Sequence, residues 1–264
     1  MSPASPALVE TLRPVGLDEL VGTAELLTRI DRKYVVPVAD LDVLLSGTGP
    51  GTRVLQIDGR RRFGYRSVYF DTPALDSYLS TARRRRQRFK VRTRSYLDSG
   101  LHVLEVKTRG PRGLTVKQRL PYTGDGHGLD RGDRERVAAL LGQRGIAVDP
   151  TALQPVLTTR YDRTTLLLAS GTSRLTVDTG LTWSLVGAEP ATAATDRAVV
   201  ETKSGRGTSE VDRLLWSLGR RPSSLSKYGT GLAILRPELP ANRWRPVLRG
   251  RLIPADPTPT TGRD

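Results

Sequence analysis

The chain has no cysteine among its 264 residues. Disulfide bonds, thiolate metal centres and cysteine nucleophiles are therefore excluded, and this composition is compatible with a reducing cytoplasm. Histidine is nearly absent as well, because only His102 and His127 occur. A metal centre built from several imidazole rings is therefore not expected, and carboxylates remain the candidate ligands for a divalent cation.

Long apolar runs are also missing. No stretch approaches the roughly 18 consecutive apolar residues of a membrane-spanning helix, and residues 1–14 contain no apolar signal-peptide core. We therefore expect a soluble, cytoplasmic protein without a membrane span, which would reach a membrane only through a membrane-protein partner. Aromatic residues make up only 5% of the chain. This disfavours specific nucleic-acid binding, because RNA-recognition proteins usually stack bases on exposed rings.

Negative charge is scarce relative to positive charge. The chain has 42 lysine and arginine residues against 27 aspartate and glutamate residues, which gives a net charge of +15. Such an excess indicates an anionic partner: nucleic acid, an acidic membrane surface or a phosphate-rich small molecule. Charge alone does not distinguish these partners, and a solvated basic surface is the plain alternative.

Cations are abundant, and in one segment they occupy every second position. The run consists of Arg84, Arg86, Arg88, Lys90, Arg92 and Arg94. If this segment is extended, all six side chains project from one face. Shorter alternating patterns recur at Lys33, Lys107, Lys117, Arg174 and Lys203. Several such strands closed into a barrel would enclose a basic interior with a few carboxylates, which suits a polyanion and a divalent cation.

Extended and helical segments alternate irregularly along the chain. The strand candidates are residues 25–36, 52–58, 64–71, 86–97, 101–109, 113–121, 155–169, 172–186 and 196–204. The helix candidates are residues 37–46, 130–145, 206–219 and 224–235. Tight turns that contain glycine or proline separate consecutive strand candidates and favour antiparallel pairing. The sequence therefore predicts an α+β fold, with a large antiparallel sheet or barrel and helices packed outside it.

One domain is expected to contain these elements, and it spans residues 16–237. Residues 1–15 contain several prolines and predict a flexible leader. Residues 238–264 are rich in proline and arginine and predict a flexible or weakly docked tail.

Three carboxylates fall on the same expected strand faces as the cations: Glu105, Asp178 and Glu201. A carboxylate in a phosphate site repels the substrate unless it pairs with a cation or holds a metal. Glu201 is the best metal-ligand candidate, and a structural salt bridge is an equal alternative for each of the three. The chain contains neither a Gly-x-x-x-x-Gly-Lys-Ser/Thr loop nor a Gly-x-Ser-x-Gly elbow. Phosphoryl transfer by positioning and charge neutralisation stays open.

Eight short motifs follow one another across residues 25–235. They are Arg-Ile-Asp-Arg-Lys-Tyr (29–34), Ser-Val-Tyr-Phe-Asp-Thr-Pro (67–73), Phe-Lys-Val-Arg-Thr-Arg-Ser-Tyr (89–96), Leu-Glu-Val-Lys-Thr (104–108), Tyr-Asp-Arg-Thr (161–164), Arg-Leu-Thr-Val-Asp-Thr-Gly-Leu (174–181), Val-Glu-Thr-Lys (200–203) and Ser-Lys-Tyr (226–228). In this order they resemble the catalytic domain of the vacuolar transporter chaperone (VTC) proteins. Those proteins are the polyphosphate polymerases of the CYTH-like triphosphate tunnel metalloenzyme superfamily. The resemblance implies a tunnel walled by an antiparallel eight-stranded β-barrel.

The resemblance also implies roles for individual side chains. Those expected to line the tunnel and hold a triphosphate or the growing chain are Lys33, Arg92, Arg94, Lys107, Arg163, Arg174 and Lys227. Further phosphate contacts are expected from Lys90, Lys117, Arg119, Arg160 and Lys203. Glu201, with Glu105 and Asp178 as weaker candidates, would hold the Mn²⁺ or Mg²⁺ that bridges substrate phosphates.

The reaction implied by the resemblance moves the terminal phosphate of ATP onto an inorganic polyphosphate chain and releases ADP. The attacking oxygen belongs to a terminal phosphate, which is already ionised and needs no strong general base. Hydrolytic tunnel enzymes carry Glu-x-Glu-x-Lys on their first strand, whereas this chain has Arg29-x-Asp31-x-Lys33. That departure favours a polymerase. A triphosphatase on the same fold and a non-catalytic binder of polyphosphate or RNA remain the alternatives.

Overall fold

Eight antiparallel strands build the centre of the molecule. The computed structural model describes residues 7–24, 30–109, 115–171, 173–188, 192–194, 196–205, 207–249 and 252. The eight strands are β2 Ile30–Pro37, β4 Phe63–Asp71, β5 Phe89–Tyr96, β6 Leu101–Arg109, β7 Thr115–Leu120, β8 Gln154–Leu167, β9 Arg174–Leu185 and β11 Arg197–Ser204. Their order in the sheet is β2-β11-β9-β8-β4-β5-β6-β7, and every neighbouring pair is antiparallel.

Three short strands extend this sheet. β1 (Arg13–Val15) pairs in parallel with β3 (Arg53–Leu55), which also pairs with β8, and β10 (Thr192–Ala194) pairs with β9. The order of the eight main strands ends at β2 and β7, which do not pair with each other in the described chain. The sheet is therefore barrel-like, but backbone hydrogen bonds do not close it into a complete ring.

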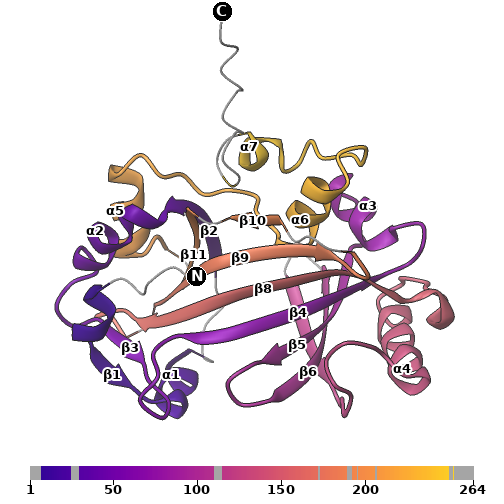
Figure 1. Ribbon diagram of the computed structural model, residues 1–264, viewed down its shortest axis with the longest axis horizontal. Coiled ribbons are helices and arrows are strands. Elements are labelled where there is room, and N and C mark those ends of the chain that lie inside the picture. The colour runs from indigo at the N-terminus through magenta and orange to yellow at the C-terminus, as the bar shows by residue number, and fades with distance from the viewer. Residues whose placement is uncertain are drawn as a thin grey trace, which may run out of the picture.

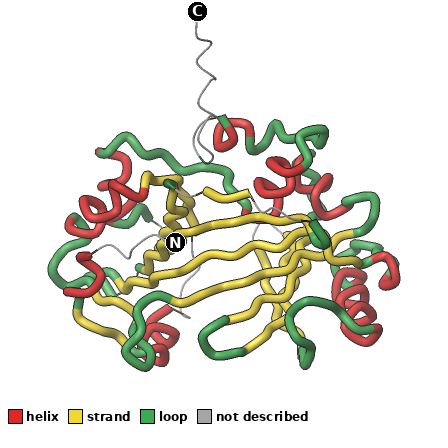
Figure 2. The backbone as a smooth tube through the Cα atoms, viewed as in Figure 1, coloured by secondary structure: helices red, strands yellow, loops and turns green. Residues whose placement is uncertain are grey.

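Helices pack around the strands (Figures 1 and 2). They are α1 Leu17–Ala24, α2 Leu41–Ser46, α3 Asp76–Ala82, α4 Arg131–Gly142, α5 Glu210–Ser217, α6 Lys227–Leu235 and α7 Arg245–Leu248. In Figure 1, α2 and α5 lie together toward one end of the sheet, and α3 and α6 lie together toward the other. The expected α+β arrangement is confirmed. None of the described helices has the length and apolarity needed to cross a membrane.

Alternation along the strands gives the sheet an apolar outer face and a charged inner face. On the outer face, Tyr34 and Val200 pack in one core with α2 and α5, whereas Val91 and Leu104 pack in another with α4. The positions between them belong to the opposite face, which we call the inner face. Its charged residues are Asp31, Lys33, Lys90, Arg92, Arg94, Glu105, Lys107, Arg109, Lys117, Arg119, Arg163, Arg174, Asp178, Glu201 and Lys203.

The inner face curves until its two halves face each other. Four strands separate β6 from β11 in the sheet. Arg92 and burial lower the pKa of Lys107 on β6, and Glu201 on β11 partly restores it. Burial and then Lys33 on β2 lower the pKa of Lys90 on β5. Charges this far apart in the sheet interact only if its two halves face each other, and we call the space between them the lumen.

Helix α6 covers part of the inner face. Its Tyr228 stacks on Tyr69 of β4 with ring centroids 5.1 Å apart. Its Gly231 lies against Trp183 of β9, and a Cβ atom at Gly231 would lie 2.0 Å from the indole ring. Only glycine allows so close an approach. This packing places Lys227, the first residue of the helix, beside the lumen.

The run of alternating cations is only partly a strand. Lys90, Arg92 and Arg94 lie on β5 as expected, but residues 83–88 form the turn that follows α3. Arg84 has a left-handed backbone with a φ of 56°, which is incompatible with an extended strand. The sequence pattern therefore predicts the face of the later three cations correctly and misplaces Arg84, Arg86 and Arg88.

Parts of both ends of the chain are ordered and contribute to the core. Within the expected leader, residues 7–15 form a short 3₁₀ helix and β1, and Val9 is buried in the core. Within the expected tail, Trp244, Val247 and Leu252 are buried against α6 and its neighbours. Scattered apolar residues thus anchor segments whose composition indicates disorder. The expected strand ends at 25–29, 113–114 and 172, the expected helix start at 206, and Arg29 of the first motif, lie outside the described residues.

Candidate functional site

Strand alternation brings most of the sequence-predicted cations together on the inner face. From the main strands these are Lys33, Lys90, Arg92, Arg94, Lys107, Lys117, Arg119, Arg163, Arg174 and Lys203. Lys227 joins them from α6. Arg160 is the exception, because it precedes Tyr161 on β8 and points to the outer face, where it is exposed near Arg66. The structure therefore does not place Arg160 with the other candidates.

Three lysines form a row across β5, β6 and β7. Lys90 lies directly opposite Lys107, and Lys107 lies directly opposite Lys117. Like charges at opposite positions destabilise a sheet. Lys117 lies 3.5 Å from Glu105, but neither Lys90 nor Lys107 forms an ion pair with any described carboxylate. Two members of this lysine row therefore form no salt bridge within the described chain.

The pKa values of these two lysines are lowered by burial and by other cations of the inner face and its surroundings. Burial, followed by Lys33, lowers the pKa of Lys90 to about 8. For Lys107 the largest cause is Arg92, followed by burial and Arg94, and the pKa falls well below its usual value. An anion in the lumen would relieve this repulsion, so this wall is suited to bind negative charge.

Glu105 forms salt bridges with three cations of the inner face: Arg92, Lys117 and Arg119. Its Oε2 accepts hydrogen bonds from Nε and Nη2 of Arg92 at 2.9 and 2.6 Å. Its Oε1 lies 3.5 Å from Lys117 and 3.6 Å from Arg119, without a hydrogen bond. Burial alone would raise the pKa of Glu105, but Arg92 and Arg94 lower it below its usual range. Glu105 therefore stays ionised inside the sheet.

Asp178 is buried on β9 between two cations. Arg163, its partner on β8, donates to both carboxylate oxygens at 2.6 and 2.8 Å, and Lys227 also donates to Oδ2. Burial would raise the pKa of Asp178, but Arg163 and Lys227 lower it to about 2. Because both oxygens are engaged, the geometry corresponds to the salt-bridge alternative, and Asp178 positions Arg163 and Lys227 in the lumen.

Glu201 lies on β11 between two lysines. Lys203 donates to its Oε1, and Lys33, the opposite residue on β2, lies 3.6 Å from the same oxygen. Lys203 also lies 3.4 Å from Asp31, so one ammonium group bridges two carboxylates. Burial would raise the pKa of Glu201, but Lys33 and Lys203 lower it well below its usual value. In both salt bridges the contact recorded is to Oε1.

The carboxylates do not form a preformed metal cage. The described residues contain no group of three or more His, Cys, Asp or Glu side chains that could hold an ion together. Mg²⁺ and related cations often bind through one or two carboxylates, while substrate phosphates complete the coordination. Glu201 fits that mode because its recorded hydrogen bond and salt-bridge contacts are to Oε1 alone. Asp178 does not, because Arg163 uses both of its oxygens.

Tyrosine rings line the inner face between the ion pairs. Tyr65 of β4 stacks on Tyr161 of β8 with centroids 5.3 Å apart. Arg163 lies over both rings, and the ammonium of Lys227 lies 4.3 Å from the centre of Tyr161. Cation–π contacts of this kind help to hold charged groups in place. Sequence analysis assigns no role to these rings, although the period-two spacing of Tyr65 and Tyr69, and of Tyr161 and Arg163, could have placed them on the inner face.

Two further contacts were not expected from the sequence. Ser226, the N-cap of α6, accepts a hydrogen bond from Lys90 at 3.0 Å and thereby links the lysine row to that helix. Arg174 lies on the inner face near α1, where its Nη2 donates to the carbonyl oxygen of Leu20 at 2.7 Å. Both contacts join segments that are distant in sequence, so no local pattern signals them.

The antiparallel sheet and its cation-lined lumen define a class of tunnel-fold proteins with a basic interior. A family model described as the VTC domain matches residues 28–236 of this chain. The chain belongs to the VTC domain family. The match spans most of the sequence, and it confirms the resemblance inferred from the eight motifs. No curated protein sequence matches the chain.

Several solved structures are similar to this chain. A protein from Hippeastrum, described as an adenylyl cyclase candidate with a dominant triphosphatase activity, is 18% identical, with a TM-score of 0.44 over 82% of this chain and 100% of that one. An adenylate cyclase candidate from Bacillus halodurans is 16% identical, with a TM-score of 0.45 over 75% of this chain and 93% of that one. A protein from Pyrococcus horikoshii is 12% identical, with a TM-score of 0.44 over 80% and 99%.

Proposed function

We propose that this protein is a polyphosphate polymerase, which transfers the terminal phosphate of ATP to the end of an inorganic polyphosphate chain. Membership of the VTC domain family supports a function on triphosphates, and polymer synthesis is the specific activity that we infer. The observation that carries the proposal is the lysine row. Lys90 and Lys107 are paired neighbours on β5 and β6, on the wall of the lumen, and neither forms a salt bridge with a described carboxylate.

A chain of phosphates is the anion that suits this wall. Side chains recur at regular intervals along and across the strands of a sheet, and a polyphosphate carries its charges with a similar regularity. Arginine binds phosphate oxygens with two parallel hydrogen bonds, whereas lysine acts as a compact point charge. Arg94 and Lys107, which form no ion pair with a described residue, would bind the reacting phosphates. Arg92, Arg163 and Lys227 would complete the site from positions fixed by their carboxylate partners.

The ionisation of the site favours phosphate over water as the attacking group. A base that activates water must accept a proton, but Glu105, Asp178 and Glu201 all have lowered pKa values and are ion-paired. A terminal phosphate oxygen of the growing chain is already ionised. That oxygen would form the new bond to the γ-phosphorus of ATP, while the bond to the β,γ-bridging oxygen breaks and ADP leaves. The surrounding cations offset the repulsion between the two anions.

A divalent cation, Mn²⁺ or Mg²⁺, would be held by the carboxylate of Glu201 together with substrate phosphates. When bound, it would neutralise part of the negative charge of the phosphates. Lys33 and Lys203 fix the Glu201 carboxylate through Oε1. The same two lysines are close enough to the lumen to contact the substrate.

Incubation of the purified protein with ATP and Mn²⁺, followed by gel separation of the products, tests the proposal. We expect long-chain polyphosphate, with one ADP released for each phosphate added. Release of free phosphate without polymer would instead support the second candidate, a triphosphatase. Polymer stable to nuclease and degraded by a polyphosphate-specific hydrolase would exclude contaminating nucleic acid.

A pair of arginine variants locates the activity on the inner face. Arg94→Ala should weaken triphosphate binding by roughly 1.5–3 kcal/mol, the scale of a hydrogen bond to a charged group. Arg160→Ala removes the same charge from the outer face of β8 and should bind triphosphate like the wild type. Both affinities are measurable by calorimetry. Equal losses in the two variants would indicate a diffuse basic surface.

A further inference from the structure

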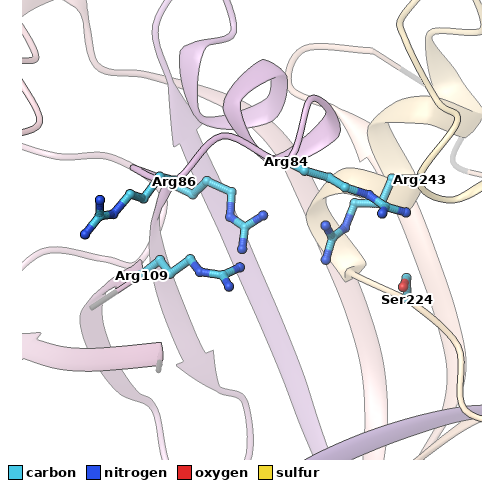
Figure 3. Close-up of a pocket in the computed structure, with 6 residues that line it drawn as sticks. Arg84, Arg86, Arg109, Ser224 and Arg243 are labelled. Atoms are coloured by element: carbon cyan, nitrogen blue, oxygen red, sulfur yellow. The ribbon is translucent and has the colours of Figure 1, made fainter. Parts of the chain in front are cut away.

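A second arginine cluster lies beside the lumen. A cavity of about 550 Å³ is lined by Arg84, Arg86, Arg88, Arg109, Ser224 and Arg243. These residues come from the turn after α3, the end of β6 and the segments on either side of α6. In Figure 3 the guanidinium groups of Arg109 and Arg243 point toward each other, and the side chain of Arg84 extends alongside Arg243. We call this feature the arginine cavity.

The arginines of this cavity have no acidic partner within the described chain. No carboxylate is among the described residues that line it, and none of its five arginines forms a salt bridge with a described residue. Burial, followed by the charges of Arg84 and Arg109, lowers the pKa of Arg243. Because the arginines repel one another, an anion that enters the cavity would be bound by several guanidinium groups at once.

The backbone at Arg84 is strained in a way that glycine would avoid. Helix α3 ends in a Schellman motif, in which the N–H of Arg85 donates to the carbonyl of Ser80 at 2.8 Å and the N–H of Arg84 to that of Thr81 at 3.2 Å. The residue in the position of Arg84 adopts the left-handed conformation, which glycine usually supplies in this motif. A cationic residue held in this conformation indicates a role for its side chain.

The arginine cavity adjoins the lumen. Arg109 follows Glu105 and Lys107 on the inner face of β6. On β5, the pKa of Lys90 is lowered by burial, by Lys33 and then by Arg243. Arg243 of the cavity and Lys90 of the lysine row are therefore close enough to interact electrostatically. A linear anion can therefore contact both sets of cations at the same time.

We propose that the arginine cavity binds the distal part of a polyphosphate chain whose terminal phosphates lie in the lumen. This inference rests on the proposed function and adds a site that recognises chain length. A long chain can fill the lumen and still extend into the cavity, so the cavity would favour long chains over ATP and tripolyphosphate. No aromatic residue lines it, so the bases of single-stranded RNA would find no surface for stacking.

The test compares how long-chain polyphosphate and tripolyphosphate bind to three variants. Arg84→Gly removes a cavity arginine and also relieves the left-handed backbone, so its melting temperature should equal or exceed that of the wild type. Arg243→Ala removes a second cavity arginine. Arg85→Ala is the matched control, because it removes the same charge from the same turn at a position that does not line the cavity. Calorimetry or fluorescence competition gives each affinity without any turnover.

We expect long-chain polyphosphate to bind about tenfold more weakly to Arg84→Gly and Arg243→Ala, the effect of one lost charge-assisted hydrogen bond. Tripolyphosphate affinity should be unchanged in both, and Arg85→Ala should match the wild type throughout. An equal loss in Arg85→Ala, or a parallel loss of tripolyphosphate binding, would overturn the proposal. So would equally tight binding of single-stranded RNA that depends on Arg84.

The outcomes separate this site from the proposed polymerase activity. A protein that makes no polymer but binds long chains through Arg84 would refute the polymerase and leave the cavity in place. A protein that makes polymer while Arg84→Gly and Arg243→Ala retain full long-chain affinity would refute the cavity alone.

Discussion

The charge of Lys107 is expected to destabilise the free protein and to favour the binding of an anion. Lys107 lies between Lys90 and Lys117 and has no described carboxylate partner. Because methionine has a similar shape without the charge, Lys107→Met should stabilise the free protein by up to about 1 kcal/mol. The same change should abolish the rise in melting temperature that tripolyphosphate causes. Urea unfolding and thermal shift measure the two effects.

Lys117→Met is the control for this substitution. Lys117 lies 3.5 Å from Glu105, so its removal takes away an attraction together with a repulsion. We therefore expect no gain in stability from this variant. Destabilisation by Lys107→Met under the same conditions would show that the lysine row does not repel itself as inferred.

Lys90 predicts a pH dependence for binding. Its pKa is lowered to about 8 in the folded protein, against about 10.4 for an unfolded lysine. Between these values the unfolded chain binds more protons than the folded one, so the contribution of Lys90 to stability rises with pH in this window. A bound phosphate would raise the pKa of Lys90 again. Tripolyphosphate binding near pH 8 should therefore take up protons.

Calorimetry in buffers of different ionisation enthalpy measures this proton uptake. The uptake should fall clearly in Lys90→Met and should persist in Arg160→Ala, whose side chain lies on the outer face. An uptake that is identical in Lys90→Met and the wild type would assign it to another group.

Glu105 and Glu201 should respond differently to the same isosteric change. Glu105 is fully buried against Arg92, so Glu105→Gln leaves an uncompensated buried cation and should cost about 3–5 kcal/mol of stability. Glu201 is more accessible, and Glu201→Gln should keep the fold while removing metal-dependent turnover. Unfolding curves and product assays in parallel measure both. Full turnover of Glu201→Gln at ordinary Mn²⁺ concentrations would remove Glu201 from the metal site.

At the scale of elements, the close packing of α6 against β9 depends on one glycine. Gly231 faces Trp183, and a Cβ atom there would lie 2.0 Å from the indole ring. Gly231→Ala should therefore destabilise the protein by about 1–3 kcal/mol, the usual cost of overpacking a core. It should also weaken tripolyphosphate binding, because α6 carries Lys227 into its contact with Asp178. Denaturant unfolding and calorimetry test the two effects.

A second helix supplies the control for this substitution. Gly142 ends α4 with open space around its Cβ position. Gly142→Ala should be neutral or stabilise the protein by up to about 1 kcal/mol, because alanine favours the helix. If Gly231→Ala behaved in the same way, the packing of α6 against Trp183 would be looser than the structure indicates.

At the scale of the whole molecule, the net charge of +15 would attract any polyanion, but the lumen should distinguish them by shape. Charge attraction to a surface is weakened by salt, whereas fixed hydrogen bonds in an enclosed site are weakened less. At physiological salt, tripolyphosphate should raise the melting temperature, and duplex DNA at matched charge should not. The shift should disappear in a Lys33→Ala/Arg94→Ala variant, which removes cations from β2 and β5. Comparable stabilisation by DNA would contradict an enclosed site.

Much of the inner face could be predicted from the sequence, because alternation is a property of a single strand. Lys90, Arg92 and Arg94 share a face whatever strands lie beside them. The same rule signals that Arg160 and Arg163 lie on opposite faces of one strand, since their positions differ by an odd number. Motif order was enough to identify the family, which the match over residues 28–236 confirms.

Tertiary structure alone decided which charges have partners. Asp31 meets Lys203 and Lys33 meets Glu201 because β2 and β11 pair in one register, and residues far apart in the chain set that register. The curvature of the sheet then brings Lys33 near Lys90 across the lumen. The left-handed turn at Arg84 directs cations of the alternating run into a separate cavity. Local sequence determines the direction of a side chain relative to its own strand, whereas its electrostatic environment depends on how distant strands pair and curve.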